Sequence, residues 1–201
     1  MKAGGIILAG GKGSRLGREK CGLEIAGITL LQRVVDSLEP IAGEILIVVK
    51  AAGGQPPSLA SRAGLRVVED KVSGKGPLAG IAAGLAGSTY KLNLVVACDQ
   101  PLLNRGLLEY LVSAADGYEA VIPRIGDKLE PLQGVYSRDC IDAIENLLSE
   151  DKRKIDNLFS LVRTRFIEAE EIERFDPQHL SFFNINTQAD LEKAEKLLAA
   201  G

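Results

Sequence analysis

The sequence holds few of the residues that bind metals through nitrogen or sulfur. Its 201 residues include no tryptophan, one histidine (His179) and three cysteines (Cys21, Cys98 and Cys140). The cysteines show no CxxC spacing, so zinc and iron–sulfur sites lack ligands. An odd, scattered set of cysteines is typical of a reducing compartment rather than of a disulfide scaffold. We therefore expect Cys98 to pack as a small apolar side chain.

Strong charge and long apolar runs are also missing. A net charge of -3 and 4% aromatic residues exclude the basic field and the stacking platforms that nucleic-acid binding uses. No apolar run approaches the roughly 20 residues that span a bilayer. The apolar stretch after Lys2 is too short for a signal peptide, because Gly10 and Gly11 interrupt it. These features predict a soluble, cytoplasmic protein with no nucleic-acid or membrane partner.

Short apolar segments that are typical of buried strands alternate with segments of helical periodicity. Thr29 is the expected N-cap of the first helix, and Thr187 with Asp190 form a capping pair at the last. The alternation predicts one domain over 1–201 with an α/β fold, built as three α/β/α layers around a mostly parallel, Rossmann-like sheet. Strands are expected at 4–9, 44–49, 65–68, 92–98, 119–123, 132–137, 162–167 and 182–185, and helices at 29–38, 77–85, 103–115, 140–148, 154–161 and 187–200.

A glycine-rich segment, 9–20, leaves the first strand where ligands bind in open α/β sheets. Glycines such as Gly10 and Gly11 let successive backbone N–H groups point inward and form an anion-binding nest. Four cations within nine residues, two of them Arg15 and Lys20, match a polyphosphate. A structural turn is the alternative, but such a turn has no need for these two side chains.

Two common phosphate motifs do not fit this segment. A P-loop requires G-x-x-x-x-G-K-[ST], whereas Gly13 follows Lys12 here. A dinucleotide fingerprint requires G-x-G-x-x-G, whereas Leu16 stands at the position of the last glycine. The P-loop kinase and dehydrogenase hypotheses are therefore excluded.

Acidic residues follow two of the expected strands. Asp99 comes directly after an apolar run, and Asp70 ends another. Their carboxylates should emerge at the ligand-binding edge, and Mg²⁺ prefers one or two carboxylates together with phosphate oxygens. Asp99 as a turn residue before Pro101, and Asp70 as a turn former before Ser73, are the structural alternatives. The pattern favours a magnesium site at Asp99.

Five segments stand in order along the chain: LAGGKGSRLGREK at 8–20, VED with GPLAG at 68–80, ACDQP at 97–101, EPL at 130–132 with Tyr136, and FNINT at 183–187. Together they resemble the molybdenum cofactor guanylyltransferases. The resemblance implies a reaction in which the terminal phosphate of molybdopterin attacks the α-phosphate of GTP, giving the guanine dinucleotide cofactor and pyrophosphate. It also implies molybdoenzyme maturation proteins as partners.

The resemblance implies roles for individual residues. Asp99 would hold Mg²⁺, and Arg15 and Lys20 would stabilise the charge on the α-phosphate and on the leaving pyrophosphate. Asn184 and Asn186 would lie near the second substrate, although Asn186 could equally cap the last helix. The residues implied to bind the nucleotide are Leu8, Ala9, Gly10, Gly11, Lys20, Asp70 and Asp99.

Two departures from the family pattern and three rival functions stay open. Lys50 and the alanines after it stand where the family often has asparagine, and Glu130 replaces a frequent histidine. Cobinamide-phosphate guanylyltransferases and molybdopterin cytidylyltransferases share several of these motifs. A catalytically silent nucleotide-binding module is the alternative from another class. The choice of base rests on the resemblance and not on the spacing.

Overall fold

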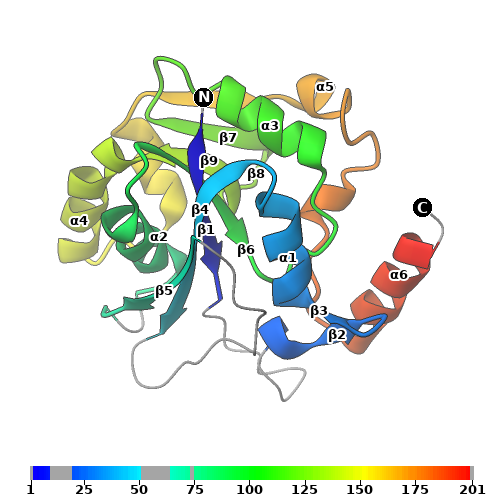
Figure 1. Cartoon of the computed structure of the whole chain (residues 1–201). Coiled ribbons are helices and arrows are strands. Elements are labelled where there is room, and N and C mark those ends of the chain that lie inside the picture. The colour runs from blue at the N-terminus through cyan, green and yellow to red at the C-terminus, as the bar shows by residue number, and fades with distance from the viewer. Residues whose placement is uncertain (1, 10–19, 51–63, 73–74, 200–201) are drawn as a thin grey trace.

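The computed structural model describes residues 2–9, 20–50, 64–72 and 75–199 and centres on a twisted sheet (Figure 1). The strand order is β10-β7-β9-β6-β1-β4-β5, and the short β8 pairs with β7. Within this sheet, over the residues that the structure describes, β9 and β8 run antiparallel to the strands they pair with and the other pairings are parallel. The mostly parallel sheet confirms the expected fold class. The strands are β1 (Ala3–Leu8), β4 (Ala42–Lys50), β5 (Leu65–Asp70), β6 (Leu92–Ala97), β7 (Ala120–Ile125), β8 (Lys128–Leu129), β9 (Gln133–Ser137) and β10 (Thr164–Ile167).

Helices cover both faces of this sheet. In Figure 1, α2 and α4 lie on one side and α1 and α3 on the other. Two large apolar cores result, and neighbouring strand residues contribute to opposite cores: Ile6 packs with α2 and Ile7 with α1. The helices are α1 (Leu30–Leu38), α2 (Pro77–Gly87), α3 (Arg105–Ser113), α4 (Ile141–Ser149), α5 (Ala169–Ile172) and α6 (Gln188–Ala199), with 3₁₀ turns η1 (Lys20–Gly22), η2 (Arg138–Cys140), η3 (Ile155–Ser160) and η4 (Leu180–Phe182).

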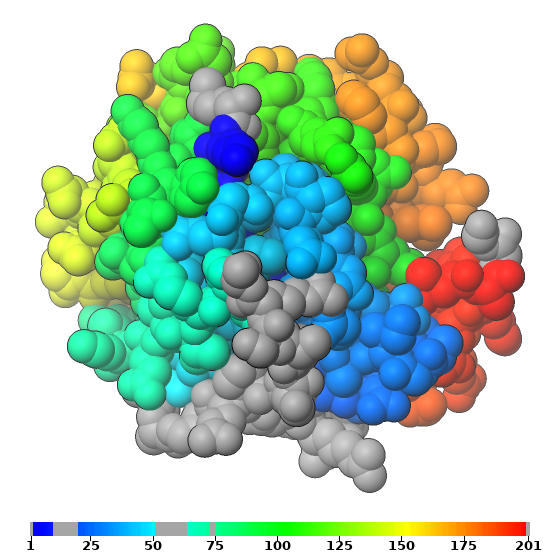
Figure 2. Space-filling view, in the orientation of Figure 1, coloured from blue at the N-terminus to red at the C-terminus, as the bar shows by residue number. Residues whose placement is uncertain are grey.

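A third, smaller core joins the two ends of the chain. It consists of Ile25, Leu30, Ile185 and Ala194 and is called the hairpin core below. Ile25 belongs to a hairpin of β2 (Glu24–Ile25) and β3 (Ile28–Thr29). This hairpin lies beside α6, and their surfaces adjoin in the space-filling view (Figure 2).

The expected helix caps are confirmed. Thr29 Oγ1 accepts a hydrogen bond from the Gln32 N–H at 3.1 Å. Thr187 Oγ1 accepts from the Asp190 N–H at 3.2 Å, and Asp190 Oδ2 accepts from the Thr187 N–H at 2.8 Å. In the part of the chain that the structure describes, no helix is long and apolar enough to cross a bilayer.

The strand expected at 182–185 is wrong. Phe182 ends η4, and the residues after it form a loop that does not pair with the sheet. Ile185 belongs to the hairpin core and Phe183 packs against it. The Ile185 N–H donates to the Asp99 carbonyl at 2.9 Å. The apolar alternation that suggested a strand reflects packing against this small core. Sequence reasoning also missed the β2–β3 hairpin, whose turn places Ala26 and Gly27 at positive φ.

Candidate functional site

The carboxyl edge of the sheet, where the parallel strands β1, β4, β5 and β6 end, carries the site. Leu8 pairs with Val48 on one side and Ala97 on the other. The Ala9 N–H donates to the Val48 carbonyl at 2.9 Å, and the Cys98 N–H donates to the Leu8 carbonyl at 3.2 Å. Leu8 and Ala9 therefore occupy the middle of this edge, one strand away from Asp99.

A glycine brings α2 close to the same edge. A Cβ on Gly80 would lie 3.2 Å from Leu8 Cδ2, a tighter contact than most side chains make. Gly80 therefore allows α2 to pack directly against the end of β1. The small glycine of the GPLAG segment is therefore explained by helix packing alone, independently of any contact that the segment makes with a ligand.

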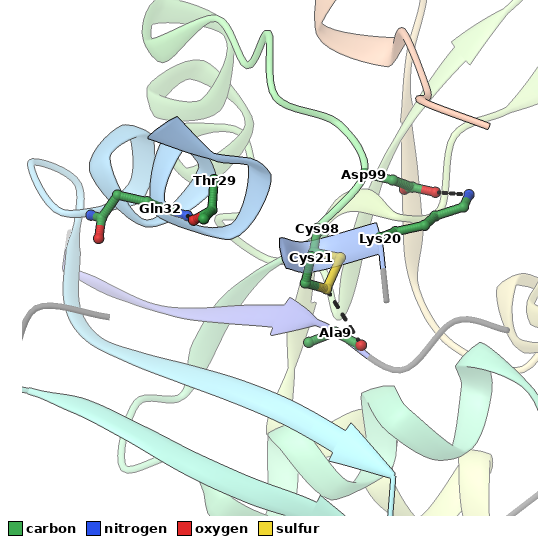
Figure 3. Close-up of a disulfide and its surroundings, with 7 residues drawn as sticks. All are labelled: Ala9, Lys20, Cys21, Thr29, Gln32, Cys98 and Asp99. Atoms are coloured by element: carbon green, nitrogen blue, oxygen red, sulfur yellow. Dashed lines mark hydrogen bonds and ion pairs between the residues drawn. A yellow bond between two sulfur atoms is a disulfide. The ribbon is translucent and has the colours of Figure 1, made fainter. Parts of the chain in front are cut away.

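Three side chains from distant parts of the chain meet at the carboxyl edge. Lys20 Nζ lies 2.8 Å from Asp99 Oδ2 and 2.7 Å from Asn186 Oδ1. These three residues are called the Lys20 cluster below. Figure 3 shows the Lys20–Asp99 contact between η1 and the segment after β6. The side chains of Lys20 and Asp99 are 17% and 20% exposed, so both stay accessible to a ligand.

The structure separates the two asparagines. Asn186 joins the Lys20 cluster through its side-chain oxygen, and Thr187 with Asp190 cap α6 in its place. Asn184 instead donates its Nδ2 hydrogen to the Phe182 carbonyl at 3.0 Å within its own loop. Of the pair, only Asn186 reaches Lys20.

Asp70 lies at the same edge but apart from the Lys20 cluster. It ends β5, pairs with Lys50 on β4 and is 9% exposed. Its Oδ1 accepts a hydrogen bond from the Val72 N–H at 2.9 Å, which is the contact of a turn former. Three strand spacings, about 14 Å, separate the ends of β5 and β6.

Several expected site residues lie outside the described residues. They are Gly10, Gly11 and Arg15. Their roles stay predictions. The alanines after Lys50, at the family's asparagine position, lie outside as well.

The EPL segment has a packing role in this structure. Tyr136 is fully buried, and its hydroxyl donates to the Pro131 carbonyl at 2.7 Å. Burial holds the pKa of Tyr136 well above its ordinary value, so this hydroxyl keeps its proton. Glu130 is also buried and pairs with Lys128. Neither side chain contacts the Lys20 cluster among the contacts of the described residues.

Cys98 is buried in the apolar core, as expected, but it is not a free thiol. It forms a disulfide with Cys21, with the two Cα atoms 5.8 Å apart (Figure 3). Sequence reasoning missed this bond because the two cysteines are 77 residues apart. Their places in the sequence did offer a signal, since Cys21 follows Lys20 and Cys98 precedes Asp99.

Comparison with known proteins identifies the family. A model described as the MobA-like NTP transferase domain matches residues 5–165. The chain belongs to this MobA-like family. A probable molybdenum cofactor guanylyltransferase of Pelotomaculum thermopropionicum is 40% identical over 96% of this chain and 92% of that protein. The molybdenum cofactor guanylyltransferase of Desulfosudis oleivorans is 33% identical, covering 98% of this chain and 96% of that one.

A solved structure supports the same family. Molybdopterin-guanine dinucleotide biosynthesis protein A from Archaeoglobus fulgidus superposes with a TM-score of 0.84 at 30% identity, covering 100% of both chains. The resemblance that the sequence motifs suggested is thus confirmed. As a MobA-like protein the chain is a nucleotidyltransferase, and the expected three-layer fold is that of the family.

Proposed function

We propose that this MobA-like chain transfers GMP from GTP to the terminal phosphate of molybdopterin and releases pyrophosphate. The observation that carries the proposal is the Lys20 cluster, which joins an ammonium group to a carboxylate at the ligand-binding edge. The names of the relatives, which cover nearly the whole chain, support guanine as the base and molybdopterin as the acceptor.

Asp99 suits a magnesium ion. Its carboxylate is a hard oxygen ligand at the open edge of the sheet. Within the described ranges, no group of three or more His, Cys, Asp or Glu residues could hold a metal. This sparse set fits Mg²⁺, which takes one or two carboxylates and completes its shell with phosphate oxygens and water. When bound, the ion would neutralise phosphate charge.

The Lys20 ammonium group would bind the phosphates directly. Its ammonium group now contacts Asp99 and Asn186, but a triphosphate at this edge offers stronger acceptors for the same group. Transfer to an α-phosphate requires positioning and charge stabilisation more than covalent catalysis. Lys20, with Arg15 as the second proposed cation, would stabilise the charge that develops on the α-phosphate and on the leaving pyrophosphate.

The width of the carboxyl edge suits one nucleotide. Asp70 ends β5 and Asp99 follows β6, and these strand ends lie about 14 Å apart with β1 and β4 between them. We place the nucleoside toward Asp70 and the phosphates toward Asp99, across Leu8 and Ala9. Gly10 and Gly11 would line the same path. Asn186 would then face the incoming molybdopterin. Asn184, whose Nδ2 donates within its own loop, would act on that substrate only through the loop.

The test is to incubate the protein with Mg²⁺, molybdopterin and GTP, CTP or ATP in turn, and to measure pyrophosphate and the dinucleotide product. We expect product from GTP alone. Product from CTP alone would overturn the guanine assignment and leave nucleotidyl transfer standing. A parallel reaction with cobinamide phosphate tests the rival acceptor. GTP binding without pyrophosphate from either acceptor would overturn the enzymatic proposal.

A further inference from the structure

The residues that flank the Lys20–Asp99 pair are themselves covalently joined. Cys21 directly follows Lys20, Cys98 directly precedes Asp99, and the two cysteines form a disulfide (Figure 3). The bond therefore links the backbone that carries the ammonium group to the backbone that carries the carboxylate. Nothing in the proposed transfer reaction uses the two sulfur atoms.

Apart from the disulfide, the main chain at Asp99 and the main chain at Lys20 are held by different contacts. Asp99 follows the central strand β6, the Cys98 N–H donates to the Leu8 carbonyl, and the Asp99 carbonyl accepts from the Ile185 N–H at 2.9 Å. Lys20 begins η1, which is three residues long, and its carbonyl accepts one hydrogen bond, from the Leu23 N–H at 3.0 Å. The sheet thus fixes Asp99, whereas the described backbone contacts of η1 are its packing against α1 and a hydrogen bond close in sequence.

The ion pair alone fixes Lys20 poorly. A partly exposed pair in contact with solvent contributes little to holding two segments together, and in the proposed reaction phosphate oxygens and Mg²⁺ compete for the same two charged groups. The disulfide persists when that contact breaks, because it joins main-chain segments rather than the reacting groups. It also lies against the residue that follows β1, with Cys21 Sγ 3.5 Å from the Ala9 carbonyl oxygen.

We propose that the Cys21–Cys98 disulfide positions Lys20 against Asp99 for nucleotidyl transfer, so that reduction of this bond slows the reaction. The inference rests on the roles proposed above for these two residues. Reduction by a dithiol adds two electrons and two protons to the two sulfur atoms, and the dithiol becomes a disulfide. The cysteines are positioning residues, since they act through their neighbours.

Thiol counts in denaturant test whether the bond forms. We expect one thiol per chain, from Cys140, in the oxidised protein and three after reduction. Cys140 is buried in the core on the other face, and burial raises its pKa to about 12, so denaturation is needed to expose it. The Cys140→Ser variant should then give no thiol before reduction and two after it. Three thiols in unreduced protein would overturn the inference.

Kinetics separate a positioning role from a structural one. With GTP, molybdopterin and Mg²⁺, well below the melting temperature of either form, we expect reduction to lower kcat about tenfold or more with less change in KM for GTP. Oxidation should restore the rate of the wild type and of Cys140→Ser. The Cys21→Ala/Cys98→Ala variant should resemble the reduced protein and show no recovery.

Thermal unfolding and GTP binding provide further measurements. A bond that closes a long loop should raise Tm by about 5–10 °C. A fall in Tm on reduction with an unchanged kcat would show a purely structural bond and overturn the inference. A faster reduced enzyme would overturn it as well. Turnover by the oxidised protein keeps the proposed function standing in both cases, whereas GTP binding without turnover by either form would contradict the proposed function itself.

Discussion

Two polar clusters lie at opposite edges of the same sheet and differ in how fully their carboxylates are satisfied. At the amino edge, Glu44 accepts from Arg66 at 2.6 Å, from the Ser88 hydroxyl at 2.9 Å and from both the N–H and the hydroxyl of Thr89. We call these four residues the Glu44 cluster. At the carboxyl edge, the side-chain contact of Asp99 with the described part of the chain is the one with Lys20.

This difference in carboxylate partners indicates that the Glu44 cluster stabilises the fold, whereas Asp99 is available for function. Glu44 is 8% exposed, and although burial alone would raise its pKa, the hydrogen bonds from Arg66, Thr89 and Ser88 lower it to about 2. Such a carboxylate has its partners within the protein and stabilises the fold. Asp99 is more exposed and shares a cation that other anions can attract. Substitutions in the two clusters should therefore have opposite consequences.

The largest effect is expected at Asp99. Asp99→Asn keeps the shape of the side chain but removes the charge that would hold Mg²⁺. We expect kcat to fall by more than about a hundredfold, while Tm stays within about 3 °C of the wild type. Steady-state pyrophosphate release and thermal unfolding measure the two quantities. Loss of the fold in this variant would assign Asp99 to the scaffold instead.

Lys20→Ala should have the next largest effect. It removes one preorganised cation, a loss of about 3 kcal/mol in the transition state or on the order of a hundredfold in rate. Removal of a partly exposed ion pair should change the unfolding free energy by less than about 1 kcal/mol. The measurement is kcat with saturating GTP, alongside urea unfolding. A rate near that of the wild type would exclude Lys20 from the reaction.

Glu44→Gln should lower stability and leave kcat unchanged. The folded-state pKa of Glu44 lies below its ordinary value of 4.5, so its contribution is fully present above about pH 4.5 and is lost as pH falls toward 2. Because Arg66 is half exposed, we expect a loss of about 2 kcal/mol at pH 7. Urea unfolding of both proteins should converge at low pH. An equal deficit at pH 3 and pH 7 would contradict this electrostatic explanation.

The smallest effect is expected at Asn186. Asn186→Ala removes one uncharged partner of Lys20, so we expect KM for molybdopterin to rise about three- to tenfold, with little change in KM for GTP. Asn184→Ala is the matched control, because Asn184 contacts its own loop rather than Lys20. Equal effects of the two substitutions would remove the distinction that the structure draws between them.

The same comparison explains what the sequence could predict. Asp99 and Asp70 follow apolar strands, and the chain order of strands and helices places strand ends at one edge. Local sequence patterns were therefore enough to predict the sheet and to place Asp70 and Asp99 at its carboxyl edge. The caps at Thr29 and Thr187 were predictable for the same reason, since each depends on contacts within four residues.

Long-range contacts between irregular segments were not predictable in this way. Lys20, Cys21 and Asn186 lie outside the main strands and helices, and the hairpin core and the disulfide hold their segments. Neither the meeting of residues 20 and 186 nor the bond between residues 21 and 98 follows from periodicity. The family motifs supplied Lys20 and Asn186 as candidates, but their hydrogen bond came from the structure.

The central claim is that the Lys20 cluster, and not another part of this fold, performs GMP transfer. The most direct measurement is the mass of the dinucleotide formed from GTP and molybdopterin with Mg²⁺ by the wild type, Asp99→Asn and Glu44→Gln, all verified as folded. We predict the guanine dinucleotide from the wild type and from Glu44→Gln, and at most a trace from Asp99→Asn. Equal product from all three proteins would contradict the claim.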